Sequence, residues 1–195
     1  SDAIFAIVIT LLVIEIRPPE IEALTNAEVI DAIMGVVPAI SVCLLSFAVL
    51  GTYWILHHRV FKWITGYDYR LVTLNLLFML TTIFVPVTTS FLGHFANFPA
   101  ASIFYALSIG VMGLAEFAVW AYAAHKRRFI RDDIPAGLMR YVTYRILIPP
   151  AVFLLSMPIA AINANLMELS WALMIPAFLL LRFAFPHEHR LRQQM

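Results

Sequence analysis

The chain has 195 residues, of which 62% are apolar and 13% are charged, and its mean hydropathy is +0.87. Soluble proteins average about 45–50% apolar and about 25% charged residues, so this composition excludes a soluble domain and predicts an all-α integral membrane protein. The net charge of +1 gives no basic surface for nucleic acid, and the single cysteine excludes an intrachain disulfide.

Six apolar segments are long enough to be predicted as transmembrane helices of one domain, residues 1–195, because a spanning helix needs about 20 apolar residues. In chain order they cover about residues 1–16, 28–58, 70–94, 99–125, 138–161 and 166–185. The first is short, and the second is long enough to tilt or to project from the bilayer. We expect the fifth to be interrupted by Pro149, Pro150 and Pro158, which predict kinks.

Lysine and arginine gather in alternate connections between these segments. The basic connections hold Arg59, Lys62 and Arg70; then Lys126, Arg127, Arg128, Arg131 and Arg140; then Arg182, Arg190 and Arg192. The remaining connections hold only Arg17, which lies near Glu20, Glu22 and Glu28. Because cytoplasmic connections carry the excess of positive charge, both termini are predicted to be cytoplasmic.

The first segment, SDAIFAIVITLLVIEI, begins with a carboxylate. At 100° per residue, Ile7, Leu11 and Ile14 share one face with Thr10 beside it, and Asp2 lies on another face. Every face is apolar, so periodicity alone leaves these residues open to packing or lipid contact. Ser1 and Asp2 are also suited to an N-cap, worth about 1 kcal/mol.

The Ser-Asp pair at the head of this segment resembles the FSD signature of the transmembrane protein 175 family of potassium channels. The similarity extends to the six-helix plan, to the motif YWILHH that ends the second helix at Tyr53–His58, and to Asn75 early in the third. In that family an arginine and a phenylalanine precede the Ser-Asp pair, and both would fall before Ser1 here.

This resemblance implies a homotetramer in a bacterial cytoplasmic membrane, with the first helix of each subunit lining a central pore for potassium and other monovalent cations. It places Ile7 at the principal constriction, Leu11 and Ile14 in successive rings, and Thr10 at a position implicated in selectivity. Rings of aliphatic side chains close a pore by dewetting, and when open they strip part of an ion's water. Potassium is then expected to pass moderately better than sodium in a leak-type channel without a cofactor.

Two groups of polar residues are expected to be structural. If Ile7 faces the pore axis, Asp2 points toward its own subunit, where it shares one membrane level with Trp54, His57, His58 and Asn75. Such a carboxylate needs partners, because unpaired it costs about 2.5–3.5 kcal/mol near hydrocarbon.

A second structural pair is predicted from depth. Glu116 and Arg145 lie at similar depths from the cytoplasmic side of the fourth and fifth segments, which predicts a Glu116–Arg145 ion pair.

Two other classes of function remain open. One is a secondary transporter or proton-coupled permease that uses Glu116 and a proline-broken fifth helix. The other is a non-conducting scaffold in which the first helix only packs. No nucleophile–base pair, HExxH, P-loop or GxGxxG motif indicates an enzyme.

Overall fold

The structure, a computed structural model, describes residues 1–14, 16, 25–95 and 98–186, and in these ranges the named elements are all helices, in agreement with the predicted all-α class. The α-helices are α1 (Asp2–Ile14), α2 (Asn26–Trp63), α3 (Tyr69–Ile83), α4 (Val85–His94), α5 (Pro99–Ala124), α6 (Ala136–Ser156), α7 (Ala164–Ser170) and α8 (Met174–Ala184). Short 3₁₀ turns join several of them.

Five segments of the described chain are long and apolar enough to cross a membrane, so the protein is a multi-pass membrane protein. They are Asn26–Trp63, Tyr69–His94, Pro99–Arg127, Ala136–Ala161 and Ala164–Ala184, and they correspond to the second to sixth predicted segments. Helix α1 has only 13 residues, about 20 Å of helix, against a hydrocarbon core of about 30 Å. A sixth spanning helix therefore stays a prediction.

The helix ends follow from local side-chain chemistry. Thr25 and Glu28 form a capping box at the start of α2, and the Asp68 carboxylate accepts the Leu71 N–H at the start of α3. The third predicted segment is divided at Phe84, because Pro86 in the first turn of α4 has no N–H to continue the helix from α3.

Prolines in the fifth predicted segment act differently from expectation. Pro149 and Pro150 lie inside the continuous helix α6, so the interruption predicted there is absent. The helix changes instead to a 3₁₀ turn at Met157–Ala161, in which Pro158 occupies the first turn.

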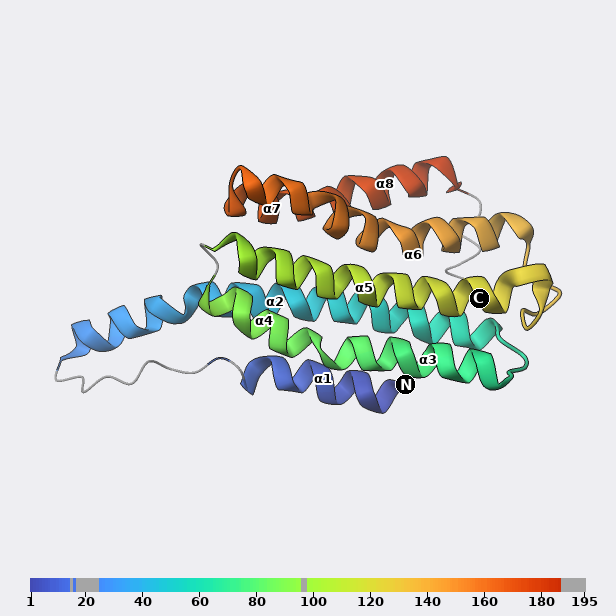
Figure 1. The fold of residues 1–195 in the computed structure, drawn as a ribbon, viewed down its shortest axis with the longest axis horizontal. Coiled ribbons are helices and arrows are strands. Elements are labelled where there is room, and N and C mark those ends of the chain that lie inside the picture. Colours follow the sequence, from blue (N-terminus) through green and yellow to red (C-terminus); the bar gives the residue numbers. More distant parts are fainter. Residues whose placement is uncertain (15, 17–24, 96–97, 187–195) are drawn as a thin grey trace.

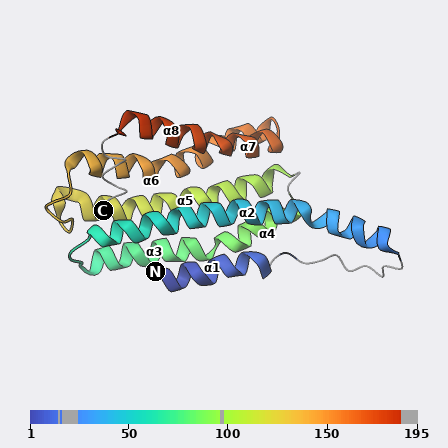
Figure 2. The ribbon, with the colours of Figure 1, turned by 180° about the vertical axis from the view of Figure 1, so that it is seen from behind.

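Helix α5 lies in the middle of the bundle (Figures 1 and 2). It packs against α6 on one side and against α3 and α4 on the other. Helix α1 lies along one edge, and α7 and α8 lie along the opposite edge (Figure 1). The N-terminal part of α2 extends beyond the other helices.

Two glycines of α5 allow α6 to approach closely. A Cβ atom at Gly110 would overlap the Leu154 side chain, and one at Gly113 would overlap the Tyr53 hydroxyl and lie 2.8 Å from the Pro150 ring. Small residues bring helices together in this way in membrane proteins. The same contact gives the proline-containing part of α6 its packing partner.

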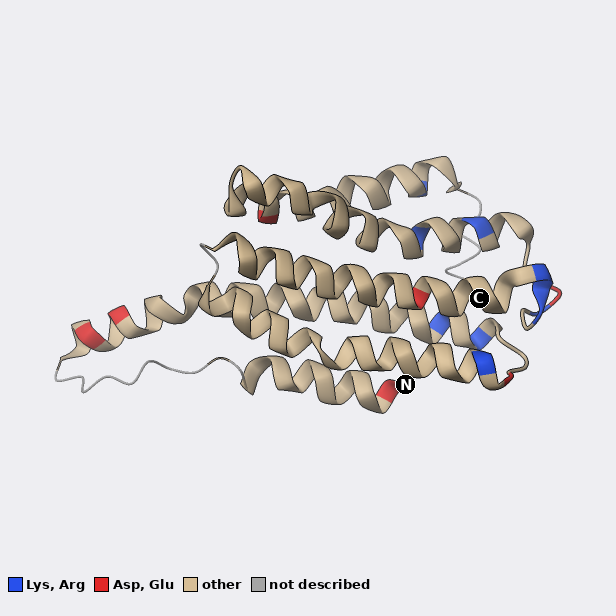
Figure 3. Cartoon of the chain, in the orientation of Figure 1, with Lys and Arg blue, Asp and Glu red and all other residues tan. Residues whose placement is uncertain are grey.

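Charged side chains are divided between the two ends of the bundle (Figure 3). Lysine and arginine gather where α2 ends and α3 begins and around the α5–α6 connection, whereas the protruding end of α2 carries only acidic groups. Of the charges used to predict orientation, Arg17, Glu20, Glu22, Arg190 and Arg192 lie outside the described residues. The cytoplasmic placement of the termini stays a prediction.

At the basic end, the α2–α3 and α5–α6 connections are joined by backbone hydrogen bonds. The Thr65 N–H donates to the Phe129 carbonyl at 2.8 Å, and the Arg131 N–H donates to the Trp63 carbonyl at 3.1 Å. Asp68 adds a side-chain link, because its carboxylate accepts from the Tyr122 hydroxyl at 2.6 Å.

This hydrogen bond from Tyr122, together with the Leu71 N–H and the Arg128 guanidinium, lowers the pKa of the Asp68 carboxyl below its ordinary value. The charged form of Asp68 is therefore the one that holds the two connections together.

Candidate functional site

Helix α1 has one buried face, which packs against α2, α3 and α4. Phe5, Val8 and Leu12 are almost completely buried there. The Phe5 ring lies 6.1 Å from the His57 ring and 5.9 Å from the Phe78 ring, measured between centroids. These contacts fix the rotation of α1 about its own axis.

The opposite face of α1 is exposed in the single subunit and carries the residues predicted to line a pore. Ile7 is 59% exposed, Ile14 is 65% exposed and Leu11 is 38% exposed. Thr10 is exposed between them, and its hydroxyl donates to the Ile7 carbonyl at 2.8 Å. The Thr10 oxygen keeps its lone pairs available as acceptors.

Asp2 contacts α2 of its own subunit. Its carboxylate accepts from the Trp54 indole N–H at 3.0 Å, and its other oxygen lies 3.6 Å from Nδ1 of His58. Ser1 contributes through its backbone, since its carbonyl accepts from the N–H groups of Ile4 and Phe5. This arrangement ties the first turn of α1 to the last turns of α2.

The remaining members of the predicted network lie elsewhere. His57 is buried, and its Nδ1 lies 2.9 Å from the Glu116 carboxylate on α5. Asn75 on α3 is half-buried, and its side-chain oxygen accepts no hydrogen bond from the described residues. The structure therefore brings together Asp2, Trp54 and His58, and separates His57 from them.

The predicted Glu116–Arg145 ion pair is wrong for this structure. Glu116 is completely buried and bonds to His57, whereas the Arg145 guanidinium lies over the Phe178 ring, 4.9 Å from its centroid. Matching depths along two helices do not fix the direction in which each side chain points. On α5 the Glu116 side chain points toward α2, as its contact with His57 shows, and not toward Arg145 of α6.

The His57–Glu116 pair was not predicted, although a signal for it exists in the sequence. Tyr53 and His57 are four residues apart on α2, and Gly113 and Glu116 are three apart on α5, so each pair shares one helix face. The polar face of α2 and the glycine-containing face of α5 together indicate that these two helices pack closely. Within the described ranges, no three His, Cys, Asp or Glu side chains lie close enough together to hold a metal ion.

Comparisons with known proteins agree with the resemblance seen in the first helix. Residues 1–86 match the family model described as the endosomal/lysosomal potassium channel TMEM175. The chain is 25% identical to a potassium channel of Chamaesiphon minutus over 84% of its own length and 82% of that protein. It is 29% identical to a potassium channel of Streptomyces collinus over 85% of its length and 82% of that protein.

A solved structure shares the fold. The crystal structure of a lysosomal potassium-selective channel TMEM175 homolog from Chamaesiphon minutus has a TM-score of 0.78 at 24% sequence identity, over 92% of this chain and 93% of that one. This structure shows the same fold, and the family model and the two relatives bear out the resemblance predicted from the first helix.

Proposed function

The chain is a relative of the TMEM175 family of ion channels, and on that premise we propose that it is the subunit of a homotetrameric potassium channel whose pore is lined by four copies of α1. The relatives are named as potassium channels, which supports potassium as the permeant ion. Their names describe channels rather than enzymes. Leak-type conduction with moderate selectivity over sodium is part of the proposal. Potassium is the permeant ligand, and no cofactor is required.

The observation that carries the proposal is the two-faced packing of α1. One face is anchored by Phe5, Val8 and Leu12, and the other presents Ile7 and Ile14 outward with Thr10 between them. Four such faces around an axis would give the aliphatic rings expected at Ile7, Leu11 and Ile14. The Thr10 oxygen would offer a polar group beside the narrowest ring.

The anchoring contacts support the same orientation. Asp2 is held by Trp54 and His58, on a side of α1 away from the centre of the exposed face. A carboxylate in this position stabilises the helix within its subunit rather than coordinating the ion. The transporter hypothesis rests on Glu116 and on a fifth helix broken by proline. Helix α6 is continuous across Pro149 and Pro150, so of these two features only Glu116 still supports a transporter.

Potassium flux from proteoliposomes tests the proposed gate. Ile7→Asn and Leu11→Asn are each expected to raise the flux by about tenfold and to bring the potassium-to-sodium ratio close to one, because a wetted ring stops excluding hydrated ions. The matched control is Val13→Asn, since Val13 is 64% exposed but lies to one side of the Ile7–Ile14 stripe. Its flux is expected to stay within about twofold of the wild type.

Unchanged flux in both variants would remove these side chains from the permeation route. Crosslinking in mild detergent separately tests the assembly, with four subunits expected. A stable monomer that still moves potassium would favour a transporter.

A further inference from the structure

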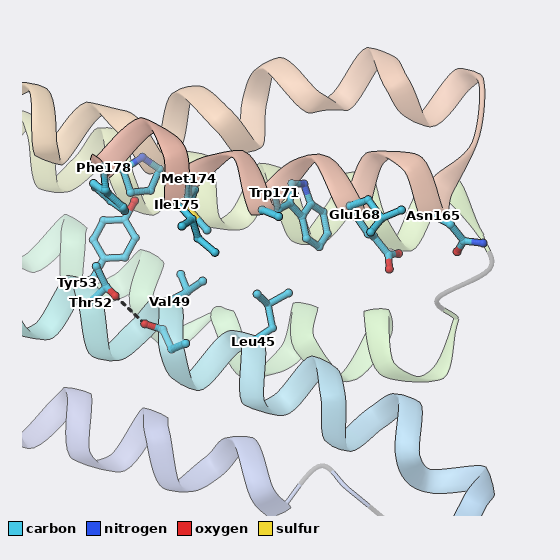
Figure 4. Close-up of a pocket in the computed structure, with 14 residues that line it drawn as sticks. Leu45, Val49, Thr52, Tyr53, Asn165, Glu168, Trp171, Met174, Ile175 and Phe178 are labelled. Carbon is cyan, nitrogen blue, oxygen red and sulfur yellow. Dashed lines mark hydrogen bonds between the residues drawn. The ribbon is translucent and has the colours of Figure 1, made fainter. Parts of the chain in front are cut away.

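A large cavity separates α2 from the C-terminal helices (Figure 4). Its volume is about 630 Å³, and its lining comes from α2, Pro149 of α6, and the segment from α7 to α8. Leu45 and Val49 of α2 face Trp171, Met174 and Ile175 across it. Small-molecule sites have volumes of about 300–1,000 Å³ and mostly apolar walls, so the cavity has the size and surface of a ligand site.

One end of this cavity carries a carboxylate that forms no ion pair with a described residue. Glu168 of α7 is half-buried, and one of its oxygens accepts from the Ser102 hydroxyl at 2.7 Å. None of the ion pairs among the described residues includes Glu168. A carboxylate that is partly removed from water, with one neutral donor, is stabilised when a cation joins it.

The position of Glu168 is open to such a cation. Figure 4 shows its carboxylate directed into the space toward α2, beside the Trp171 indole, with Asn165 at the rim. An indole face also attracts an ammonium group. The two side chains together make a cation-accepting end on an otherwise apolar cavity.

The charges around this end select the sign of the ligand. The protruding part of α2 at the same end of the bundle carries Glu28 and Asp31, whereas lysine and arginine gather at the other end (Figure 3). Among the described residues no lysine or arginine lines the cavity, and the Arg145 guanidinium lies over the ring of Phe178, which lines it. A phosphate group would therefore meet carboxylates without a basic partner.

We infer that this cavity is a binding site for a lipophilic primary amine. The alkyl body lies against Leu45, Val49 and Ile175, and the protonated amine donates to the Glu168 carboxylate beside Trp171. A phospholipid is disfavoured, because its phosphate adds a negative charge next to Glu168. The inference is independent of the proposed pore, since α1 contributes no residue to the cavity.

Photolabelling tests the site directly. The protein in a neutral maltoside detergent is irradiated with dodecylamine that carries a diazirine in mid-chain, and labelled peptides are identified by mass spectrometry. Adducts are expected on α2 near Leu45 and Val49 and on α8 near Ile175. Unlabelled dodecylamine should displace the probe about tenfold better than dodecanol, because only the amine forms a charge-assisted hydrogen bond.

Variants identify the group that selects the amine. Glu168→Gln keeps the Ser102 bond and should weaken amine displacement by about tenfold, with dodecanol unchanged. Asp31→Asn removes a carboxylate from the same end of the bundle but outside the cavity, and should change neither. Val49→Phe fills the cavity and should reduce labelling by the probe, as well as the binding of both competitors. If Glu168→Gln does not fold, two measurements still test the amine site: labelling of Val49→Phe, and displacement of the probe by dodecylamine compared with dodecanol.

Three outcomes would overturn the inference. Equal displacement by dodecanol would show an unselective apolar groove. Displacement by phosphatidylethanolamine at least as strong as by dodecylamine would show a phospholipid site. Adducts absent from the cavity, with α2–α8 crosslinks between different subunits, would show that a second copy covers it.

Discussion

His57 and His58 are adjacent in the sequence but have different surroundings. His57 is 1% exposed and pairs with the buried Glu116, while the side chain of His58 is 43% exposed beside Asp2. Successive residues of an α-helix point about 100° apart, so one histidine faces the interior of the bundle and the other faces α1. His57 therefore bonds to α5 and His58 lies beside Asp2 of α1, while the His57 ring also lies against Phe5 of α1.

A double-mutant cycle tests the pairing of Glu116 with His57. Glu116→Ala is expected to destabilise the protein by about 3–5 kcal/mol, because it leaves a buried partner unpaired, and Glu116→Gln by less, because an acceptor oxygen remains. The free energy of unfolding in mixed micelles should show a coupling of about 1 kcal/mol or more between Glu116→Ala and His57→Ala. Coupling to Arg145→Ala should stay below about 0.5 kcal/mol.

If Glu116 coupled to Arg145 instead, the assignment of His57 as its partner would be wrong. A second measurement comes from α1, because the His57 ring contacts Phe5. Loss of Glu116 should therefore make α1 more accessible to crosslinking reagents before the bundle unfolds.

Asp68 gives the protein an acid-sensitive contact. Its folded-state pKa lies below the ordinary value of 3.8, so its contribution to stability is present above about pH 3.8 and is lost as the pH falls through the folded pKa. The melting temperature of Asp68→Asn should be lower than that of the wild type at pH 7, and the difference should shrink toward pH 3. Asp132→Asn is the control, because that carboxylate makes no side-chain bond among the described residues.

A constant difference between Asp68→Asn and the wild type across this pH range would contradict the contact. It would mean that the carboxylate charge contributes nothing and that the substitution acts through packing or the helix cap alone.

At the scale of the helices, close packing of α5 determines the positions of its neighbours. Gly113 lies where α2, α5 and α6 meet, and both the Tyr53 hydroxyl and the Pro150 ring occupy the space of its absent side chain. The Pro150 ring is rigid and cannot rotate away. The helices themselves must move if any side chain is added.

Gly113→Ala is therefore expected to lower stability by about 1–3 kcal/mol through overpacking. Gly51→Ala is the matched control, since a Cβ there has no atom within 4 Å, and alanine is the better helix former by about 1 kcal/mol. Thermal unfolding in detergent should separate the two variants in opposite directions. Equal melting temperatures would show that the contact at Gly113 relaxes without cost.

The lengths of the helices could be predicted better than their directions. The fourth segment was expected at about 99–125 and is found at Pro99–Ala124, because hydropathy follows the lipid-embedded length. The division at Phe84 was missed, although Pro86 is visible in the sequence, because one proline is compatible with either a kink or a break. The partner of Glu116 could not be predicted in the same way. The sequence gives the position of a residue along its helix, but the direction of its side chain depends on how the helices pack against each other.

At the scale of the whole molecule, the sequence predicted five of the spanning segments and the family. Helix α1 presents Ile7 outward from its subunit, and the lining of a pore by this face stays a prediction. The polar anchor was partly predicted: Trp54 and His58 contact Asp2, whereas His57 and Asn75 do not. A shared level along the helices does not distinguish side chains that lie on different helix faces.

The length of α2 also determines how deeply the protein is immersed in its bilayer. Residues 32–58, between the acidic end at Asp31 and the basic end at Arg59, form about 40 Å of helix, somewhat more than the hydrocarbon thickness. Moving the bundle along the membrane normal by more than about 5 Å would bring one of these charged ends into the hydrocarbon core. The cost is about 2.5–3.5 kcal/mol for each charged residue. The charged residues at both ends of α2 therefore oppose displacement along the membrane normal. In a thinner membrane, α2 must tilt to keep both charged ends in water.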